Sequence, residues 1–225
     1  MNRRNKTHHF KAAFTLMEML VVITIIAVLA TLLFALTSSM RKKASSATSV
    51  SNLRQIGAAI VSYASDYNST LPGPVLSDHS PLYQNNSNAG WLGWLLKDYL
   101  SSVPQPNSPK PRVFYTSALD YPSAKSGAKT AGANWKPTYV VVAKQTDAIT
   151  GAAFWPMGNY TGTQQPMTTA QLSARETRGK PWITEIDQII RPNKLAEEQP
   201  PHGKFRNTLM FDYSVKAIPL GDSVW

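Results

Sequence analysis

An uninterrupted apolar run near the N-terminus dominates the pattern of hydrophobic and polar positions in this chain. Residues 14–36 are 23 positions in which Glu18 is the only charged side chain. As an α-helix, a run of this length extends about 34 Å, which is enough to span the hydrocarbon core of a bilayer. We therefore expect residues 14–36 to form a transmembrane helix. A lone carboxylate there costs on the order of 2.5–3.5 kcal/mol near mid-membrane, and less near the interface where Glu18 would lie, so its presence favours a functional role.

Apolar residues continue beyond this run at spacings of three and four, the pattern of one helical face packed on a core. The sequence Leu71-Pro72-Gly73-Pro74 then ends the helix, which we expect to run to about Asn68. We predict that residues 37–70 extend the first helix to about 50 residues in total. Its outer half would pack on a globular head of residues 71–225. The recurring apolar residues are Leu53, Ile56, Ile60, Tyr63 and Tyr67.

Short segments rich in β-branched and aromatic residues predict strands in the head. Two of them flank Asp212-Tyr213 and predict a β-hairpin at the C-terminus. A long N-terminal helix packed on a small antiparallel sheet is an α+β fold. The predicted strands are residues 112–115, 138–144, 182–186, 208–211 and 214–218, and a short helix or buried turn is predicted at residues 91–96.

Both flanks of the apolar run are basic. A short leader carries four basic residues and no acidic one, and a basic cluster at residues 41–43 follows the run. A short cationic leader before the first apolar helix normally leaves the N-terminus in the cytoplasm. We expect a single-pass membrane protein whose head lies on the side of the membrane away from the cytoplasm. The leader's basic residues are Arg3, Arg4, Lys6 and Lys11.

The junction between leader and apolar run carries a resemblance. The sequence Phe14-Thr15-Leu16-Met17-Glu18 resembles the processing site of type IV pilins and of the pseudopilins of type II secretion. The resemblance implies that a prepilin peptidase removes residues 1–13 by cutting between Ala13 and Phe14, and methylates the new Phe14 amine. It also implies that Glu18 is an assembly residue. The family usually has Gly before the cut, where this chain has Ala13.

The partners implied by this resemblance are the prepilin peptidase, further copies of the chain, other pilins or pseudopilins, the inner-membrane assembly platform and membrane lipid. The chemistry of Glu18 agrees with it, because a carboxylate in a low-dielectric region favours a cationic partner such as the Phe14 amine of a neighbouring subunit. A plain signal anchor would need neither Glu18 nor this residue order. A cleavable secretory signal is disfavoured, because the run exceeds the usual apolar segment of about 7–15 residues.

Composition restricts the remaining possibilities. Removal of the four basic leader residues leaves 19 basic against 13 acidic residues, a net charge of +6 rather than +10. The excess is spread along the chain apart from residues 41–43, so we expect no nucleic-acid partner. The absence of cysteine excludes disulfides, thiol catalysis and cysteine metal sites.

A second resemblance lies near the C-terminus. His202, nine intervening residues and Asp212 resemble the H-x9-D-G signature of pseudopilin-like proteins common in Planctomycetes and Verrucomicrobia, to which residues 52–72 are also similar. This chain has Tyr213 in place of the Gly. A tight type I′ turn needs positive φ at both central residues, so we expect a longer or altered turn here. We expect His202 and Asp212 to have structural roles, as hydrogen-bonding groups of the hairpin.

We expect no enzyme activity, no metal and no cofactor. Only His79 and His202 remain after the leader, and two carboxyl pairs, at residues 185/187 and 197/198, lack metal-ligand spacing. Two function classes stay open. The first is a structural subunit, a pseudopilin or minor pilin of a type II secretion or type IV pilus-like filament. The second is a membrane-tethered exported binding module that forms no filament. Glu18 distinguishes them, because an anchor alone would tolerate an apolar residue there.

Overall fold

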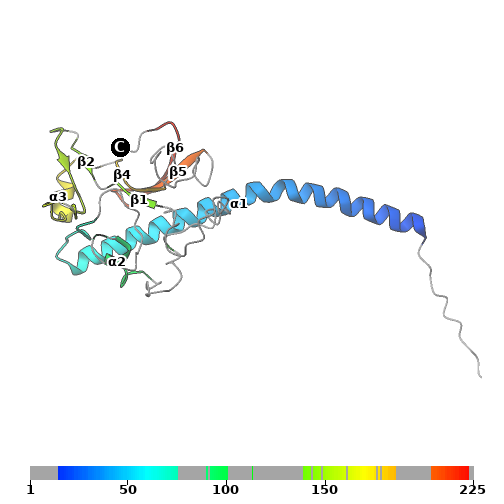
Figure 1. The fold of residues 1–225 in the computed structure, drawn as a ribbon, viewed down its shortest axis with the longest axis horizontal. Helices are drawn as coiled ribbons and strands as arrows, with labels where there is room; N and C mark the ends of the chain where they lie inside the picture. Colours follow the sequence, from blue (N-terminus) through cyan, green and yellow to red (C-terminus); the bar gives the residue numbers. More distant parts are fainter. Residues whose placement is uncertain are drawn as a thin grey trace, which may run out of the picture. The chain divides into compact units, whose positions relative to one another are not determined.

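The chain consists of two compact units, Met1–Arg41 and Lys42–Trp225. The structure, a computed structural model, describes residues 15–75, 90, 92–100, 113, 139–142, 144–147, 149–160, 162–175, 177, 179–185 and 204–222. At residues 34–36, 38 and 140 it describes the backbone alone. Within these ranges the elements are one long helix, two short helices and six strands (Figure 1).

Helix α1, Leu16–Asp66, has 51 residues and confirms the prediction of one continuous helix of about this length. It ends two residues before the predicted Asn68. The reason is local, because Asn68 and Ser69 adopt positive φ values of 50° and 59°. The backbone N–H of Ser69 then donates to the carbonyl of Ala64 at 2.7 Å, which satisfies one of the last helical carbonyls.

The head contains a four-stranded antiparallel sheet, which confirms the α+β prediction. Its strand order is β1-β4-β5-β6, and a separate hairpin is formed by β2 and β3. The predicted strand regions at residues 138–144 and 182–186 and the C-terminal hairpin are confirmed, as is the short helix predicted at residues 91–96. Of residues 112–115 only Val113 is described. The strands are β1 Tyr139–Val141, β2 Gln145–Thr146, β3 Ala153–Phe154, β4 Pro181–Glu185, β5 Phe205–Met210 and β6 Val215–Pro219, and the short helices are α2 Leu92–Leu95 and α3 Thr169–Ser173.

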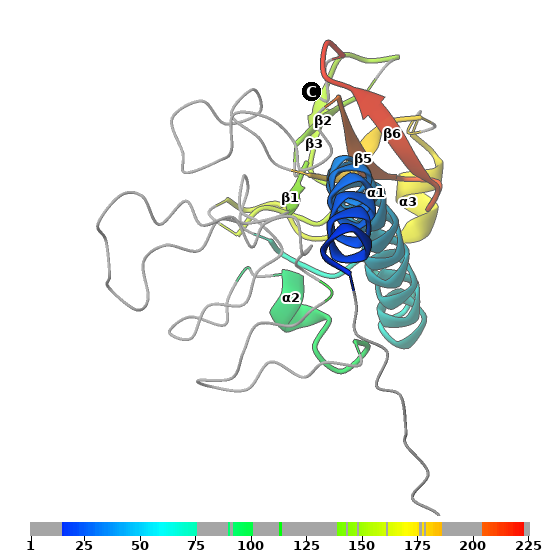
Figure 2. The ribbon, with the colours of Figure 1, turned by 90° about the vertical axis from the view of Figure 1, so that its right-hand side faces the viewer.

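The part of α1 within the head, residues 42–66, packs against the sheet; we call it the head half of α1. Figure 2 shows β5 and β6 beside this helix. Leu53, Ile56 and Ile60 are fully buried, as their spacing predicts. The prediction was wrong for Tyr67, which is 53% exposed. Tyr67 lies beyond the end of α1 and stacks on the ring of Tyr63, with the ring centroids 4.2 Å apart.

The turn of the C-terminal hairpin differs from a type I′ turn, as expected. The strands pair up to Leu209 and Val215, and the Tyr213 N–H donates to the Met210 carbonyl at 3.0 Å. Only Tyr213 has positive φ in this loop, at 62°. This matches the hairpin class in which a turn is followed by one left-handed residue. The Tyr213 ring meets that of Trp182 edge-on, at 5.7 Å between centroids.

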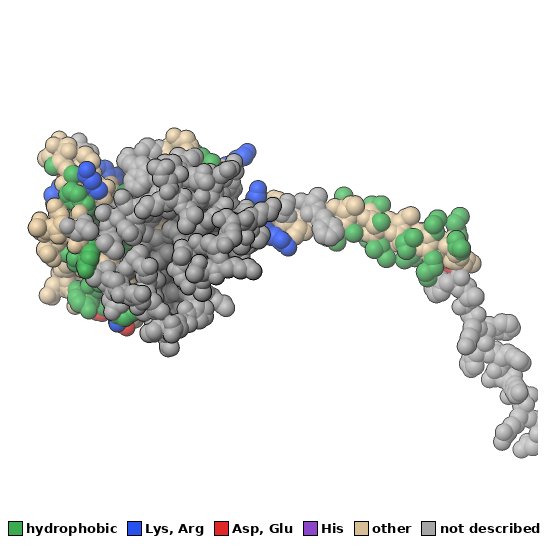
Figure 3. All heavy atoms as spheres, viewed as in Figure 1, with side chains coloured by type: hydrophobic (Ala, Val, Ile, Leu, Met, Phe, Trp, Pro, Cys, Tyr) green, Lys and Arg blue, Asp and Glu red, His purple; other side chains and the backbone are tan. Residues whose placement is uncertain are grey.

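The first unit holds a segment that is long and apolar enough to cross a membrane. Leu16–Leu33 has a mean hydropathy of 2.6, and none of its side chains is buried in the structure. Figure 3 shows its hydrophobic side chains in green along this part of the helix. Such a surface is unstable in water, which fits membrane anchoring.

Candidate functional site

Thr15 and Glu18 form a capping box at the start of α1. The backbone N–H and the hydroxyl of Thr15 donate to Glu18 Oε2 at 2.8 and 2.9 Å. In return, the Glu18 N–H donates to Thr15 Oγ1 at 3.2 Å. Two backbone donors that have no partner within the helix are satisfied in this way. The helix begins at Leu16 for this reason.

This geometry holds Glu18 on the first helical turn. Both Thr15 hydrogen bonds end on Oε2, and among the described residues no hydrogen bond reaches Oε1. Within the described residues, Oε1 is therefore left for a further donor. Sequence reasoning missed the capping box, although a Thr followed three residues later by a Glu is its known signal.

The predicted processing residues, Ala13 and Phe14, lie outside the described residues. The cut between them and the pairing of the Phe14 amine with Glu18 stay predictions. What the structure adds is the position of Glu18, three residues after the helix N-cap and at one end of the apolar segment Leu16–Leu33.

The C-terminal motif is described only in part, because His202 lies outside the described residues. Asp212 Oδ1 accepts hydrogen bonds from the Ser214 hydroxyl at 2.5 Å and the Ser214 N–H at 3.0 Å. These two bonds hold the pKa of Asp212 below its usual value. Asp212 thus accepts hydrogen bonds from Ser214 within its own turn. The structural role predicted for His202 and Asp212 together stays a prediction.

A buried polar cluster, which sequence reasoning missed, joins the head half of α1 to three strands. We call Glu185, Ser49, Tyr139 and Asn207 the Glu185 cluster. Glu185 and Ser49 are fully buried, and Glu185 Oε1 accepts a hydrogen bond from the Ser49 hydroxyl. The backbone N–H of Asn207 donates to Glu185 Oε2 at 2.7 Å, and the Tyr139 hydroxyl donates to Ser49 Oγ at 3.1 Å.

Burial raises the pKa of Tyr139 far above its ordinary value, and the neighbouring Glu185 adds to this rise. Tyr139 therefore stays a neutral donor at physiological pH. A fully buried site of this kind is closed to solvent-borne substrates, whereas its hydrogen bonds orient α1 on the sheet. We assign the Glu185 cluster a positioning role within the fold.

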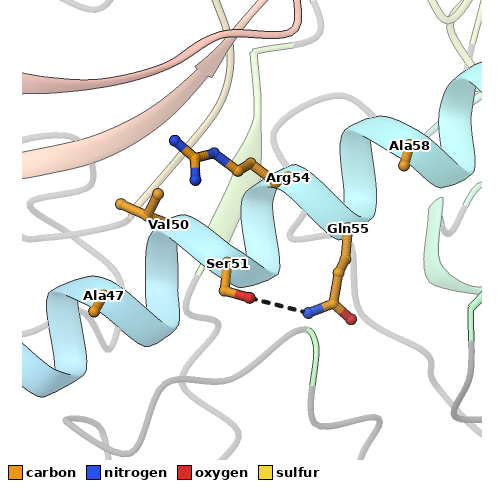
Figure 4. A pocket seen from close by; sticks show the side chains of 6 residues that line it. All are labelled: Ala47, Val50, Ser51, Arg54, Gln55 and Ala58. Carbon is orange, nitrogen blue, oxygen red and sulfur yellow. Dashed lines mark hydrogen bonds between the residues drawn. The ribbon is translucent and has the colours of Figure 1, made fainter.

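The exposed side of the head half of α1 carries a groove of about 500 Å³. All six lining side chains that the structure describes come from α1 (Figure 4), and the Gln55 amide donates to Ser51 Oγ at 3.3 Å. Among these six side chains, Arg54 is the one cation and none is a carboxylate. Among the described residues no group of three or more His, Cys, Asp or Glu could hold a metal ion. The lining residues are Ala47, Val50, Ser51, Arg54, Gln55 and Ala58.

One comparison with known proteins bears on the N-terminal segment. Residues 9–34 match the family model of the prokaryotic N-terminal methylation motif. The match includes Ala13, Phe14 and Glu18, and it supports a type IV pilin-like family and a protein processed as a prepilin. The matched range does not include His202 or Asp212. No curated protein and no solved structure matches the chain.

Proposed function

We propose that this protein is a structural subunit, a pseudopilin or minor pilin, of a type II secretion or type IV pilus-like filament. The observation that carries the proposal is the position of Glu18. It is the one acidic residue of an otherwise apolar, exposed helical segment, and it lies within the matched methylation motif. The burial of such an acid in a membrane is unfavourable unless a partner offsets it.

The first step is processing. Prepilin peptidase cuts between Ala13 and Phe14 at the cytoplasmic face of the inner membrane and methylates the amine of Phe14. The mature chain then has a cationic N-terminus four residues before Glu18. The basic leader is lost, and the head lies on the periplasmic or extracellular side.

The second step is assembly through α1. The Phe14 amine of one subunit pairs with the Glu18 carboxylate of the next, where Oε1, which no donor among the described residues reaches, accepts its hydrogen bond. In a low-dielectric helix bundle such a pair is strong, and one charge without the other is costly. The pair therefore sets the axial register of the filament. The exposed apolar side chains of Leu16–Leu33 are buried against neighbouring helices in the same step.

Replacement of Glu18 by Leu tests this assembly role. The Leu variant should insert and be cleaved as before, because it removes the only charge of the span and leaves the leader junction intact. Filament formation should fail, since a buried amine left without its carboxylate loses about 3–5 kcal/mol. Filaments sheared from cells, or cross-links between neighbouring helices, report the outcome.

Met19→Leu is the matched control, because it changes the adjacent exposed residue without removing a charge. It should assemble as wild type does. If the Glu18→Leu protein also assembles as well as wild type, Glu18 is not an assembly residue. A membrane-tethered binding module then becomes the better account of the chain.

The N-terminus of membrane-extracted protein tests the processing step. Intact-mass analysis should show a chain that begins at Phe14 and carries an N-methyl group. Ala13→Gly should be processed at least as well as wild type, whereas Ala13→Leu, which is bulky beside the cut, should stall processing. A chain that retains Met1, or one that starts beyond Ala30, would contradict the proposed cut.

A further inference from the structure

The charges along α1 are distributed unevenly. Between Glu18 and Asp66 the helix carries no acidic residue, and three of its four basic residues are consecutive. These three, Arg41, Lys42 and Lys43, are all exposed. We call them the basic segment. A charge run of this kind without any acidic neighbour on its own helix favours an anionic partner.

The basic segment lies at the depth of lipid headgroups. Arg41 follows Leu36, the last residue of the apolar run, by five residues, which is about 7.5 Å along the helix axis. The headgroup region extends about 5–8 Å beyond each face of the hydrocarbon core. Long Lys and Arg side chains reach back along a helix toward such a surface while their apolar stems stay on the helix.

The three side chains are spread over about 200° of the helix circumference. Among the α1 side chains that the structure describes, Ser45 is the first buried one, and it follows Arg41 by four residues and Lys42 by three. Arg41 and Lys42 therefore lie on the same face of the helix as Ser45, one turn before it. Lys43, at about 100° per residue, projects to another side. A membrane surface that surrounds the helix can thus contact all three.

We propose that Arg41, Lys42 and Lys43 bind the phosphate groups of anionic phospholipids at the membrane surface from which the head emerges. The inference rests on the membrane span and the processing proposed above. After the leader is removed, no Lys or Arg remains before the span, so the basic segment holds the Lys and Arg side chains nearest to it. Its charge is complementary to an anionic lipid surface.

The basic segment affects inward and outward movement of the helix differently. Movement of the helix toward the cytoplasm would bring three basic side chains into the hydrocarbon core, which is strongly unfavourable. Movement outward into a filament requires no Lys or Arg side chain to cross the core. Lipid binding by the basic segment therefore resists movement of the helix toward the cytoplasm more strongly than movement outward into a filament.

Lipid titration of the purified, processed full-length protein tests the inference. The protein in a non-ionic detergent is titrated with phosphatidylglycerol or phosphatidylcholine at equal concentrations, and native mass spectrometry counts the bound lipids. Wild type should retain more phosphatidylglycerol. The combined Arg41→Gln, Lys42→Gln and Lys43→Gln variant should lose at least about fivefold of this preference, the equivalent of the ~1 kcal/mol that one basic residue contributes near an anionic surface.

Arg54→Gln is the matched control. Arg54 is an exposed basic residue on the same helix, but it lies 11 residues, or about 16 Å, beyond Lys43. It should keep the wild-type preference, as should a charge-retaining variant with Arg41→Lys, Lys42→Arg and Lys43→Arg. Circular dichroism of the glutamine variant should match wild type, because all three residues are exposed.

Three outcomes would overturn the inference. The first is equal retention of the two lipids by wild type, and the second is an unchanged lipid preference in the glutamine variant. The third is displacement of phosphatidylglycerol by inorganic phosphate at the same concentration, which would indicate a site for free anions. Different outcomes contradict this inference and the proposed function. Filaments without lipid preference would contradict this inference alone, whereas an uncleaved chain without filaments would contradict the proposed function.

Discussion

The carboxylate of Glu185 on β4 accepts a hydrogen bond from the hydroxyl of Ser49 on α1, and both side chains are completely buried. The two residues are 136 positions apart in the chain. A buried carboxylate is tolerated only where donors surround it, and Ser49 and the Asn207 N–H supply them here. One and two turns further along α1, Leu53 and Ile56 lie in the apolar core. The head half of α1 thus packs on the sheet through the Ser49–Glu185 hydrogen bond and, beside it, through apolar core contacts.

Truncation of Glu185 should destabilise the head. Glu185→Ala leaves the Ser49 hydroxyl and the Asn207 N–H without their acceptor and opens a cavity, so the free energy of unfolding should fall by about 2–4 kcal/mol. Denaturant unfolding followed by tryptophan fluorescence measures this change. Gln55→Ala, on the exposed side of the same helix, should stay within about 0.5 kcal/mol of wild type. Equal transition midpoints for the two variants would show that the Glu185 cluster does not hold the helix.

A charge placed on the buried face of α1 should be more damaging than one on its exposed face. Ile56 is fully buried, so Ile56→Asp puts a carboxylate into the apolar core and should lower the free energy of unfolding by several kcal/mol. Ala58→Asp introduces the same residue on the exposed face and should change it little. Thermal unfolding of the two proteins compares them directly. Similar melting temperatures would mean that the packing face is wrongly assigned.

Two substitutions of Tyr213 separate backbone strain from ring packing. Tyr213 has a φ of 62°, which Gly adopts without a Cβ penalty, while its ring contacts Trp182. Both Tyr213→Gly and Tyr213→Ala lose the ring contacts, but only Ala retains the strain. Tyr213→Ala should therefore be the less stable of the two by about 1 kcal/mol. If both variants unfold at the same denaturant concentration, the turn has relaxed away from positive φ.

The tip of the β2–β3 hairpin should loosen in acid. Asp147 Oδ1 accepts hydrogen bonds from the N–H groups of Thr150 at 2.9 Å and Ile149 at 3.0 Å. These bonds, with Arg175 as a smaller cause, hold the pKa of Asp147 below its ordinary value. The pKa of Asp147 is thus lower in the folded protein than in the unfolded chain. Ionised Asp147 therefore contributes its full stabilisation above the ordinary aspartate pKa of about 3.9, and this contribution is lost as the pH falls through the folded-state pKa.

The matching measurement is the melting temperature as a function of pH for wild type and Asp147→Asn. The Asn variant should be less stable than wild type at neutral pH, because it lacks the ionised acceptor. The difference should shrink below about pH 4, where wild type becomes protonated. A constant difference across this range would show that the charge of Asp147 contributes nothing.

Thr15 should support the assembly role proposed for Glu18. Thr15→Val removes the hydroxyl that bonds Glu18 but keeps the backbone N–H, so filament yield should fall by less than in Glu18→Leu. Thr15→Ser retains a hydroxyl and should assemble as wild type does. Filament counts after shearing compare the three proteins. If the Val variant assembles normally, the capping box serves only the helix end.

Local patterns in the sequence predict much of this fold. The helix was predictable because its apolar face repeats at helical spacing and Leu71-Pro72 cannot continue it. The hairpin was predictable because two β-rich segments flank a turn. The misassigned Tyr67 shows the limit of such patterns, since apolar spacing continues past Asp66 although the backbone turns away at Asn68. Spacing alone does not reveal where left-handed residues end a helix.

By itself, the sequence determined the membrane-length segment, the resemblance of residues 14–18 to a processing site and the order of the main elements, because each depends on neighbouring residues. Only the tertiary structure decided that Glu185 is buried while Asp212 stays exposed in its own turn. The donors to the Glu185 carboxylate lie 136 and 22 residues away from it. Such distant partners meet only when α1 packs on the sheet, because the interaction is set by burial and geometry rather than by local spacing.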